Sequence, residues 1–202
     1  AFDKADKYRL PVMILGDGML GQIMEAVELP PMKDPSTFPK KDWAADGTGI
    51  GEKRREINSL YIDPDTLEAL NHRLFDTYAE LERNETAYEE YMTSDAEVVL
   101  VAYGTVARIM KSAVQMLREK GVKVGLLRPI TLFPFPTKPL VRLAEKDNVK
   151  SFLTVELSMG QMVEDVRLAV NGRKPVEFYG RTGGNVMVPE DVVKLVLEKE
   201  GK

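Results

Sequence analysis

The stretch Glu97-Val98-Val99-Leu100-Val101-Ala102-Tyr103, followed at once by Gly104-Thr105, decides the fold class of this chain. It is a continuous apolar run rather than an alternating one, which is typical of a strand covered on both faces of a sheet. A helix is predicted directly behind it, over residues 105–120, and Gly121 ends that helix. A strand followed by a helix in this way is the repeating unit of a doubly wound α/β domain.

The same unit recurs through the rest of the chain. We expect further strands at 122–128, 151–156 and 176–180, and further helices at 137–147, 159–171 and 189–200. The connections are long enough for right-handed crossovers between parallel strands. We therefore predict an α/β domain over 94–202, a three-layer αβα doubly wound fold with a mostly parallel sheet.

The first part of the chain does not show this regular alternation of strands and helices. Residues 1–30 hold one apolar strand at 11–15, then Gly16-Asp17-Gly18-Met19-Leu20-Gly21 and a short helical run through Glu28. One strand with one helix cannot bury both faces of a sheet, so we expect this piece to be the end of another domain. Residues 30–64 are rich in proline and have little periodicity, which indicates a connecting segment.

A single long helix is predicted over 65–92. Asp65 is in the N-cap position, with Glu68 in capping-box position behind it. Apolar residues then recur every three or four positions and form one stripe, at Leu67, Leu70, Leu74, Tyr78 and Leu81. The predicted organisation is therefore 1–30, then 31–93 as linker and long helix, then 94–202.

Composition narrows the classes of function. The chain has 202 residues, and 28 Lys+Arg against 32 Asp+Glu give a net charge of −4, which argues against nucleic acid or a membrane as the main partner. There are no cysteines, so this chain cannot supply thiolate nucleophiles or iron–sulfur ligands. No apolar run approaches the ~20 residues of a membrane span. With no initiator Met and no signal-peptide pattern, we expect a cytoplasmic chain that starts inside a longer gene product.

Two motifs favour ordinary structural roles. Gly16 to Gly21 matches GxGxxG, but the dinucleotide fingerprint also needs a second strand ending in an acidic residue, and here the helix stops at Pro30-Pro31. We interpret it as a glycine-rich turn from strand to helix. His72 is the only histidine and lies in the charged long helix, so we expect a solvated residue rather than a ligand or base. No catalytic residue and no metal site is predicted.

A third set of residues gathers where the predicted strands end. In open α/β sheets, ligands and partners meet the carboxyl edge. Thr105 and Ser158 are expected to cap helices, the Gly183-Gly184 backbone to form an anion-accepting nest, and Glu156 to be a candidate partner for Arg128. This edge is either turn chemistry with helix caps or a pocket or subunit contact that favours an anion. The candidates are Gly104, Thr105, Arg128, Glu156, Ser158, Gly160, Gln161, Arg181, Gly183 and Gly184.

At these residues the chain resembles a known family. PVMILGDGMLGQIMEAVEL at 11–29, AYGTVAR at 102–108, RPITLFPFP at 128–136, ELSMGQMVED at 156–165 and YGRTGG at 179–184 are similar to the alpha subunit of 2-oxoacid:ferredoxin oxidoreductases. The branch that acts on 2-ketoisovalerate is the most similar. The resemblance implies that residues 1–30 close a thiamine pyrimidine-binding domain and that 94–202 form a transketolase C-terminal-like domain.

The same resemblance implies a chemistry. The family converts a 2-oxoacid to an acyl-CoA and CO2, using thiamine diphosphate with Mg2+, CoA and iron–sulfur clusters that pass electrons to ferredoxin. The cofactors would be held by thiamine-diphosphate-binding and ferredoxin-like subunits, or by a preceding part of the subunit. We therefore expect this chain to be a scaffold that is inactive alone, and replacement of Arg181 to weaken assembly or raise KM.

Two alternatives stay open at this point. The chain could be the C-terminal domain of another transketolase-like enzyme, although those usually follow an unbroken pyrimidine domain. It could instead be a nucleotide-binding regulatory module that uses the glycine-rich edge of the sheet.

Overall fold

The computed structural model describes residues 1–45, 47 and 55–201. The part of the predicted connecting segment at 46 and 48–54 lies outside the described residues. The chain divides into two compact units. The first comprises Ala1–Leu15 with Gly21–Thr77, and the second comprises Gly16–Leu20 with Tyr78–Lys202.

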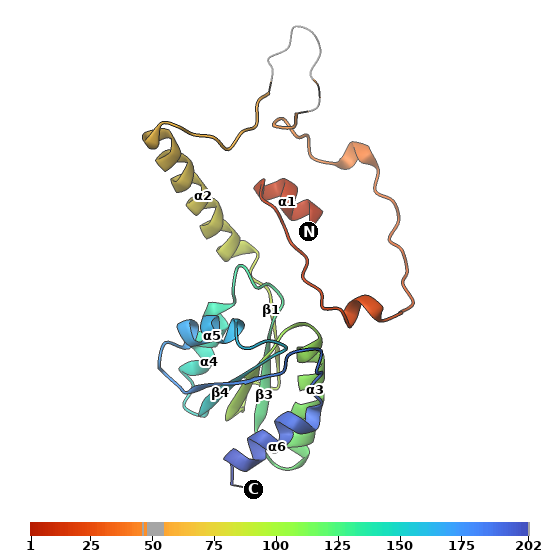
Figure 1. Ribbon diagram of the computed structural model, residues 1–202, viewed down its shortest axis with the longest axis vertical. Coiled ribbons are helices and arrows are strands. Elements are labelled where there is room, and N and C mark those ends of the chain that lie inside the picture. The colour runs from red at the N-terminus through yellow and green to blue at the C-terminus, as the bar shows by residue number, and fades with distance from the viewer. Residues whose placement is uncertain (46, 48–54, 202) are drawn as a thin grey trace. The chain divides into compact units, whose positions relative to one another are not determined.

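The second unit is an α/β domain built on one sheet (Figure 1). The strand order is β1-β3-β2-β4-β5, and every pair is parallel except that of β1 with β3. The strands are β1 (Tyr88–Tyr91), β2 (Val98–Val101), β3 (Val124–Pro129), β4 (Ser151–Glu156) and β5 (Val176–Gly180). The helices are α3 (Gly104–Glu119), α4 (Thr137–Ala144), α5 (Met162–Val170) and α6 (Pro189–Lys199).

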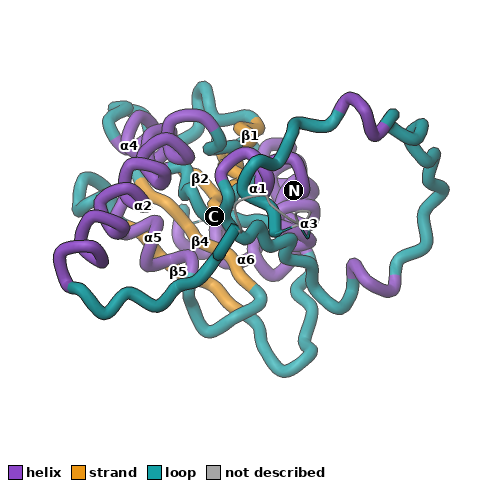
Figure 2. The backbone as a smooth tube through the Cα atoms, turned by 90° about the horizontal axis from the view of Figure 1, so that it is seen from above, coloured by secondary structure: helices purple, strands orange, loops and turns teal. Residues whose placement is uncertain are grey.

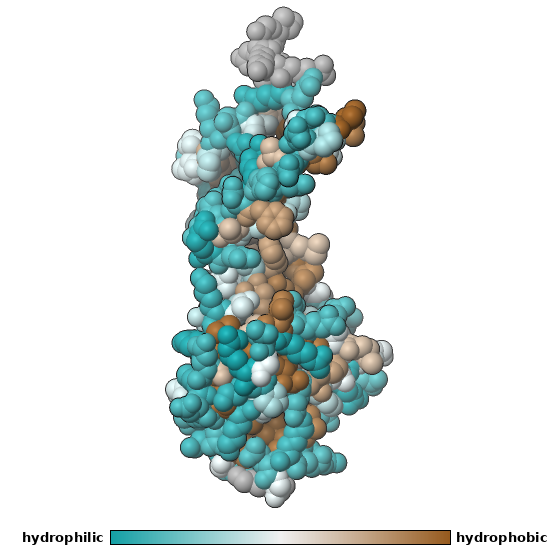
Figure 3. All heavy atoms as spheres, turned by 90° about the vertical axis from the view of Figure 1, so that its left-hand side faces the viewer, coloured by the Kyte–Doolittle hydropathy of each residue, from teal (hydrophilic) through white to brown (hydrophobic). Residues whose placement is uncertain are grey.

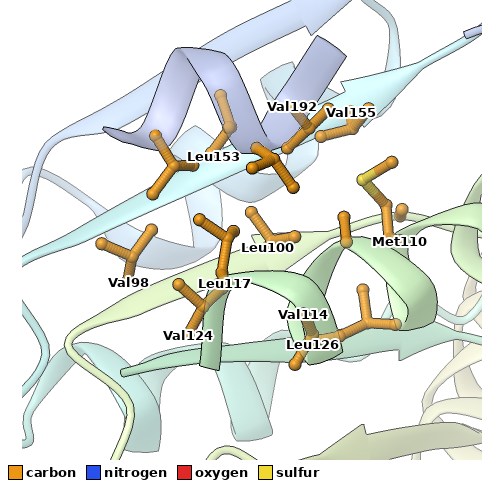
Figure 4. Close-up of a cluster of buried hydrophobic side chains, with 14 of the residues drawn as sticks. Val98, Leu100, Met110, Val114, Leu117, Val124, Leu126, Leu153, Val155 and Val192 are labelled. Carbon is orange, nitrogen blue, oxygen red and sulfur yellow. The ribbon is translucent and has the colours of Figure 1, made fainter. Parts of the chain in front are cut away.

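Alternate residues of each central strand enter two separate cores. Val98 and Leu100 of β2 pack with α3 and α6, and this cluster is drawn in Figure 4. Val99 and Val101 point to the other face and pack with α4 and α5. Figure 2 shows the strands between these two helix pairs. Successive side chains of a strand point to opposite faces, so the apolar run of β2 fills both cores at once.

The fold class predicted from the sequence is confirmed. The strands of the parallel part and their helices lie where the apolar runs predicted them, within a few residues at each end. The largest difference at a helix start is in α5, which begins at Met162 rather than at 159. Residues 157–161 form a loop instead. Gly160 has a positive φ, and hydrogen bonds to Ser158 and to the buried Glu156 carboxylate keep this segment out of the helical conformation.

The predicted helix over 65–92 is wrong in its extent. Helix α2 covers Pro64–Asn84, and Asp63 rather than Asp65 caps it, because the Asp63 carboxylate accepts a hydrogen bond from the Thr66 backbone N–H at 2.9 Å. None of its residues is buried. An exposed helix depends on local propensity rather than packing, and the Thr86-Ala87-Tyr88 stretch that follows is a poorer helix former than the Leu- and Glu-rich turns before it.

Strand β1 replaces the last predicted turns of that helix. Tyr88–Tyr91 pairs antiparallel with β3, with Tyr88 opposite Pro129 and Tyr91 opposite Leu126. The chain then passes directly over Gly125, where a Cβ atom would lie 2.6 Å from the Met92 carbonyl oxygen. Pairing with β3 therefore gives this segment backbone partners and a close contact that a continued helix would not have.

The expected strand at 11–15 and helical run through Glu28 are also wrong. The structure has α1 at Phe2–Tyr8 and short 3-10 helices η1 at Leu20–Gln22 and η2 at Pro35–Thr37, while 11–15 is irregular. Met13 and Ile14 are about four-fifths exposed, at 80% and 81%. A strand needs a neighbour for its hydrogen bonds, and a short helix needs an apolar face to pack on. Among the described residues, the sheet does not include 11–15.

The face of the α/β domain that is seen in the lower part of Figure 3 is mostly hydrophilic, with smaller apolar areas between the polar side chains. Among the described residues, no helix has both the length and the apolar character needed to cross a bilayer.

The edge strand β1 is held by charge as well as by backbone pairing, which gives a test of its role. Glu89 contacts Lys111 at 2.6 Å and Arg128 at 3.1 Å, and these contacts, Lys111 first, lower the pKa of Glu89. We predict that Glu89→Gln lowers the free energy of unfolding at pH 7 by about 1 kcal/mol or less, because the groups are only half-buried. Chemical denaturation measures this.

The sign of the pH dependence follows from the lowered pKa of Glu89. Its stabilising effect is complete above the ordinary pKa of 4.5 and is lost as the pH falls through the lower folded value. The difference between Glu89→Gln and the wild type should therefore vanish in acid. The matched control is Glu82→Gln, on the exposed part of α2. Equal effects of both variants at pH 7 would contradict the role given to Glu89.

Candidate functional site

The candidate residues lie where β2, β3, β4 and β5 end and the chain turns into the following helices. Parallel strands end at the same edge of a sheet, so the topology brings these turns together. Gly104 and Thr105 follow β2, Arg128 is near the end of β3, and Glu156 ends β4. Arg181 follows β5, and its backbone N–H donates to the Glu156 carbonyl at 3.1 Å.

Glu156 is the most constrained of them. Its side chain is 1% exposed, and its carboxylate accepts hydrogen bonds from the backbone N–H groups of Gln161, Met162 and Val163, at 3.2, 3.1 and 3.0 Å. These are the free donors at the start of α5, where a helix carries partial positive charge. The buried carboxylate therefore caps α5 from the end of the adjoining strand.

The loop between β4 and α5 is fixed around the same carboxylate. The Ser158 hydroxyl donates to Glu156 at 3.0 Å, and the Gly160 N–H donates to the Ser158 oxygen, also at 3.0 Å. Gly160 has a φ of 105°, which favours glycine. At Gly180 on β5, a Cβ atom would lie 2.3 Å from the Ser158 carbonyl oxygen. The loop can pass this close to β5 only because residue 180 is a glycine.

The two caps expected from the sequence are different in the structure. The N-cap residue of α3 is Tyr103, which makes no side-chain cap hydrogen bond, and Thr105 lies within the first turn. Ser158 lies before α5, whose N-cap residue is Gln161, and it reaches the helix only through Glu156. After β2 the turn is tight, so α3 already begins at Gly104 and Thr105 lies inside it. After β4 the loop 157–161 is long, so Ser158 lies several residues before the start of α5.

The hypothesis that Glu156 pairs with Arg128 is wrong. Strand β2 lies between β3 and β4, so the two residues are on strands that are not neighbours. Arg128 pairs with Glu89 of β1, and its Nε atom is buried without a hydrogen-bond partner. The sequence could not show this, because the partner strand β1 was predicted as helix.

The loop after β5 also has local partners. Arg181 pairs with Asp191 at 3.6 Å, and the Asp191 carboxylate accepts from the Val188 N–H at the start of α6. Gly183 and Gly184 have φ values of 67° and 81°, and the Asn185 N–H donates to the Thr182 carbonyl at 3.2 Å. Two successive positive φ values are what a tight type I′ turn requires, so the turn alone accounts for both glycines.

The charge of Glu156 contributes to the raised pKa values of two further groups, Tyr103 and Asp165. Burial, and then the Glu156 charge, raise the pKa of the Tyr103 hydroxyl above its usual 10.0. Burial, and then the charges of Glu164 and Glu156, raise the pKa of Asp165 above 3.8. No described residues form a group of three or more His, Cys, Asp and Glu side chains that could hold a metal ion. His72 is exposed on α2, as its position in the charged helix predicted.

Sequence analysis missed two residues of this edge. Glu89 pairs with Arg128, and Asp191 pairs with Arg181 while capping α6. Asp191 carried a usable signal, since an acidic residue in the first turn behind Pro189 is typical of a helix start. Glu89 contacts a residue far away in sequence, and no local pattern indicates such a contact.

Comparison with known proteins defines the class of protein first. The family model for pyruvate:ferredoxin oxidoreductase core domain II matches residues 96–192 of the α/β domain. The structure of 2-oxoglutarate:ferredoxin oxidoreductase from Magnetococcus marinus superimposes with a TM-score of 0.60 over 84% of this chain and 28% of that one, at 22% identity. This likeness supports the fold alone.

The relatives in sequence are more specific. Ketoisovalerate oxidoreductase subunit VorB of Methanothermobacter marburgensis is 46% identical over 202 residues, 100% of this chain and 56% of that protein. The 2-oxoglutarate synthase subunit KorA of Methanothermobacter thermautotrophicus is 29% identical over 98% of this chain and 58% of its own length. Along its whole length the chain is similar to subunits of 2-oxoacid oxidoreductases, and it spans little more than half the length of these curated relatives.

The capping role of Glu156 gives a direct test of how the edge is built. We predict that Glu156→Gln lowers the free energy of unfolding by about 2 kcal/mol, because the amide NH2 cannot accept the helix N–H bonds and leaves buried donors unpaired. Chemical denaturation measures the loss. Glu164→Gln, which removes an exposed carboxylate from the same helix turn, is the control and should change stability by only a few tenths. Equal losses in the two variants would refute the cap.

Proposed function

We propose that this chain is part of a subunit of a thiamine-diphosphate-dependent oxidoreductase that converts a branched-chain 2-oxoacid, such as 2-ketoisovalerate, to an acyl-CoA and CO2, with ferredoxin as electron acceptor. The observation that carries the proposal is the 46% identity to a ketoisovalerate oxidoreductase subunit along the whole chain. Identity to the 2-oxoglutarate synthase subunit is lower, at 29%. The difference supports the branched-chain substrate.

The residues present do not fit the redox groups of such an enzyme. Iron–sulfur clusters are held by cysteine thiolates, and this chain has no cysteine. Among the described residues, no group of three or more His, Cys, Asp and Glu side chains could hold a metal ion. In the proposal, these groups and CoA are therefore held by other subunits or by a part of the protein outside this chain, and the chain is inactive alone.

The geometry of the carboxyl edge supports a contact role more than an anion pocket. Both candidate cations, Arg128 and Arg181, already have carboxylate partners, and the Glu156 carboxylate occupies the start of α5. The rigid loop behind Glu156 instead presents Met159, which is 83% exposed. A fixed loop with an exposed apolar side chain suits packing against another subunit or domain. Arg181, which is ion-paired with Asp191 at this edge, is a residue whose loss would weaken that contact.

Reconstitution tests the proposal. The complete subunit that contains this chain, expressed with thiamine-diphosphate-binding and ferredoxin-like partner subunits from the same genome, is assayed for reduction of methyl viologen in the presence of CoA and a series of 2-oxoacids. We expect no reduction by the chain alone. In the assembled enzyme, kcat/KM should be at least tenfold higher for branched-chain 2-oxoacids than for 2-oxoglutarate, a difference of ~1.4 kcal/mol in transition-state binding.

The controls separate the two parts of the claim. A complex assembled without this chain should be inactive, and turnover by the isolated chain would contradict the scaffold role. A preference for 2-oxoglutarate or pyruvate would contradict the branched-chain assignment while leaving the family intact. In the complex, Arg181→Ala is expected to weaken assembly or raise KM, and Arg173→Ala, on the turn before β5, is its control.

A further inference from the structure

Strand β5 forms one edge of the sheet, beyond β4, and has an open side (Figure 2). Among the described residues it pairs only with β4. The Pro175 carbonyl and the Arg181 N–H both form hydrogen bonds to β4, at 2.9 and 3.1 Å. Hydrogen-bonding direction alternates along a strand, so the odd-numbered residues between these two also bond to β4. The backbone N–H and C=O groups of Val176, Phe178 and Gly180 therefore point away from the sheet.

The sequence of β5 lacks the usual protection of an edge strand. All of its residues are half-exposed, whereas β4 is buried from Phe152 to Glu156. Proteins protect edge strands with charges, prolines or bulges, because unpaired backbone groups attract another strand. The strand Val176–Gly180 contains no proline, and its one charged residue, Glu177, is ion-paired with Lys199 of α6. The open side of β5 is therefore suited to pairing with a further strand.

The sequence of β5 is complementary to itself. Two copies can run antiparallel with Phe178 opposite Phe178, so that Val176 of each copy faces Gly180 of the other. In this register all residues of the strand are paired, and the outward backbone groups meet in hydrogen-bonded pairs. Glu177 then faces Tyr179, whose hydroxyl is a donor for the carboxylate. Aromatic pairs across strands are stabilising, and no like charges are opposed.

Two other arrangements of the edge strands do oppose like charges. A β5 pair centred on Glu177 places this carboxylate opposite its own copy. The other edge strand, β1, has two glutamates at its centre, and a pair of β1 strands centred on Glu89 or Glu90 places that glutamate opposite its own copy. Like charges directly opposite each other destabilise a strand pair. Charge therefore favours β5 over β1, in the register centred on Phe178.

We propose that the open side of β5 is a docking surface for β5 of a second copy of this chain, and that the two sheets join across a two-fold axis at Phe178. Each copy uses the same surface, so the assembly closes at two copies. The inference stands on the sheet topology and the residues of β5, and it does not require the proposed function.

Sedimentation velocity over a range of protein concentrations tests the dimer. The wild-type chain should change from monomer to dimer as its concentration rises. Tyr179→Glu places a carboxylate opposite Glu177 on both sides of the two-fold axis, so the Kd of the dimer should rise at least roughly tenfold. Tyr179→Lys loses the same aromatic ring but places an ammonium group opposite Glu177, and it should retain the dimer. Circular dichroism checks that both variants fold, since Tyr179 also packs against the core beneath α3 and α6.

Amide hydrogen exchange of the wild-type chain tests the same surface without a substitution. The outward amides of Val176 and Phe178 should exchange more slowly as the protein concentration rises, because the dimer pairs them with a second strand. Amides of β1 should not change with concentration. This measurement decides the matter if the Tyr179 variants do not fold.

The matched control is Tyr88→Glu, which makes the same replacement on β1 at the opposite edge of the sheet. It should leave the Kd of the dimer unchanged. A chain that stays monomeric at every concentration, exchange at β5 that is independent of concentration, or equal weakening by Tyr179→Glu and Tyr179→Lys would each overturn the docking surface. None of these results would affect the proposed function, which the assay with 2-oxoacids tests separately.

Discussion

Burial of one sheet on both faces is the constraint on which the rest of this structure depends. Val99 and Leu100 are adjacent in β2, are each fully buried, and belong to different cores. Helices therefore have to cover both sides, and polar backbone groups and charged side chains are left to the ends of the strands. The chemistry of the molecule is concentrated at the carboxyl edge because the faces of the sheet have no room for it.

At that edge, side-chain carboxylates cap the starts of two helices, α5 and α6. Glu156 caps α5 from the end of a strand, and Asp191 caps α6 from within the helix. Each also fixes a neighbouring element: Glu156 holds the Ser158 loop, and Asp191 pairs with Arg181. A helix start that is already satisfied by a carboxylate is a poor site for phosphate. This argues against the nucleotide-binding module that the glycine-rich turns alone would allow.

Sequence patterns correctly predicted the elements whose structure depends on burial of their own apolar residues. They failed for elements and contacts that depend on a partner far away in the sequence. The continuous apolar runs of β2 and β4 locate the core, because such runs are typical of strands that are buried on both faces of a sheet. Strand β1 was predicted as helix because its half-exposed Tyr-Glu-Glu-Tyr sequence has no strong period, and pairing with β3 decides its structure. The site residues were gathered at the correct edge, but the partner of Arg128 was wrong, since that partner lies on the unpredicted strand.

The central claim is that the carboxyl edge of this domain is its contact face within a larger oxidoreductase. Comparing hydrogen exchange of the chain alone with that of the chain bound to its partner subunits tests this most directly. The account predicts new protection in the loop 157–161, which presents Met159, and in the turn 181–186. Protection confined to the outer surfaces of α3 and α6, with the edge loops unchanged, would contradict it.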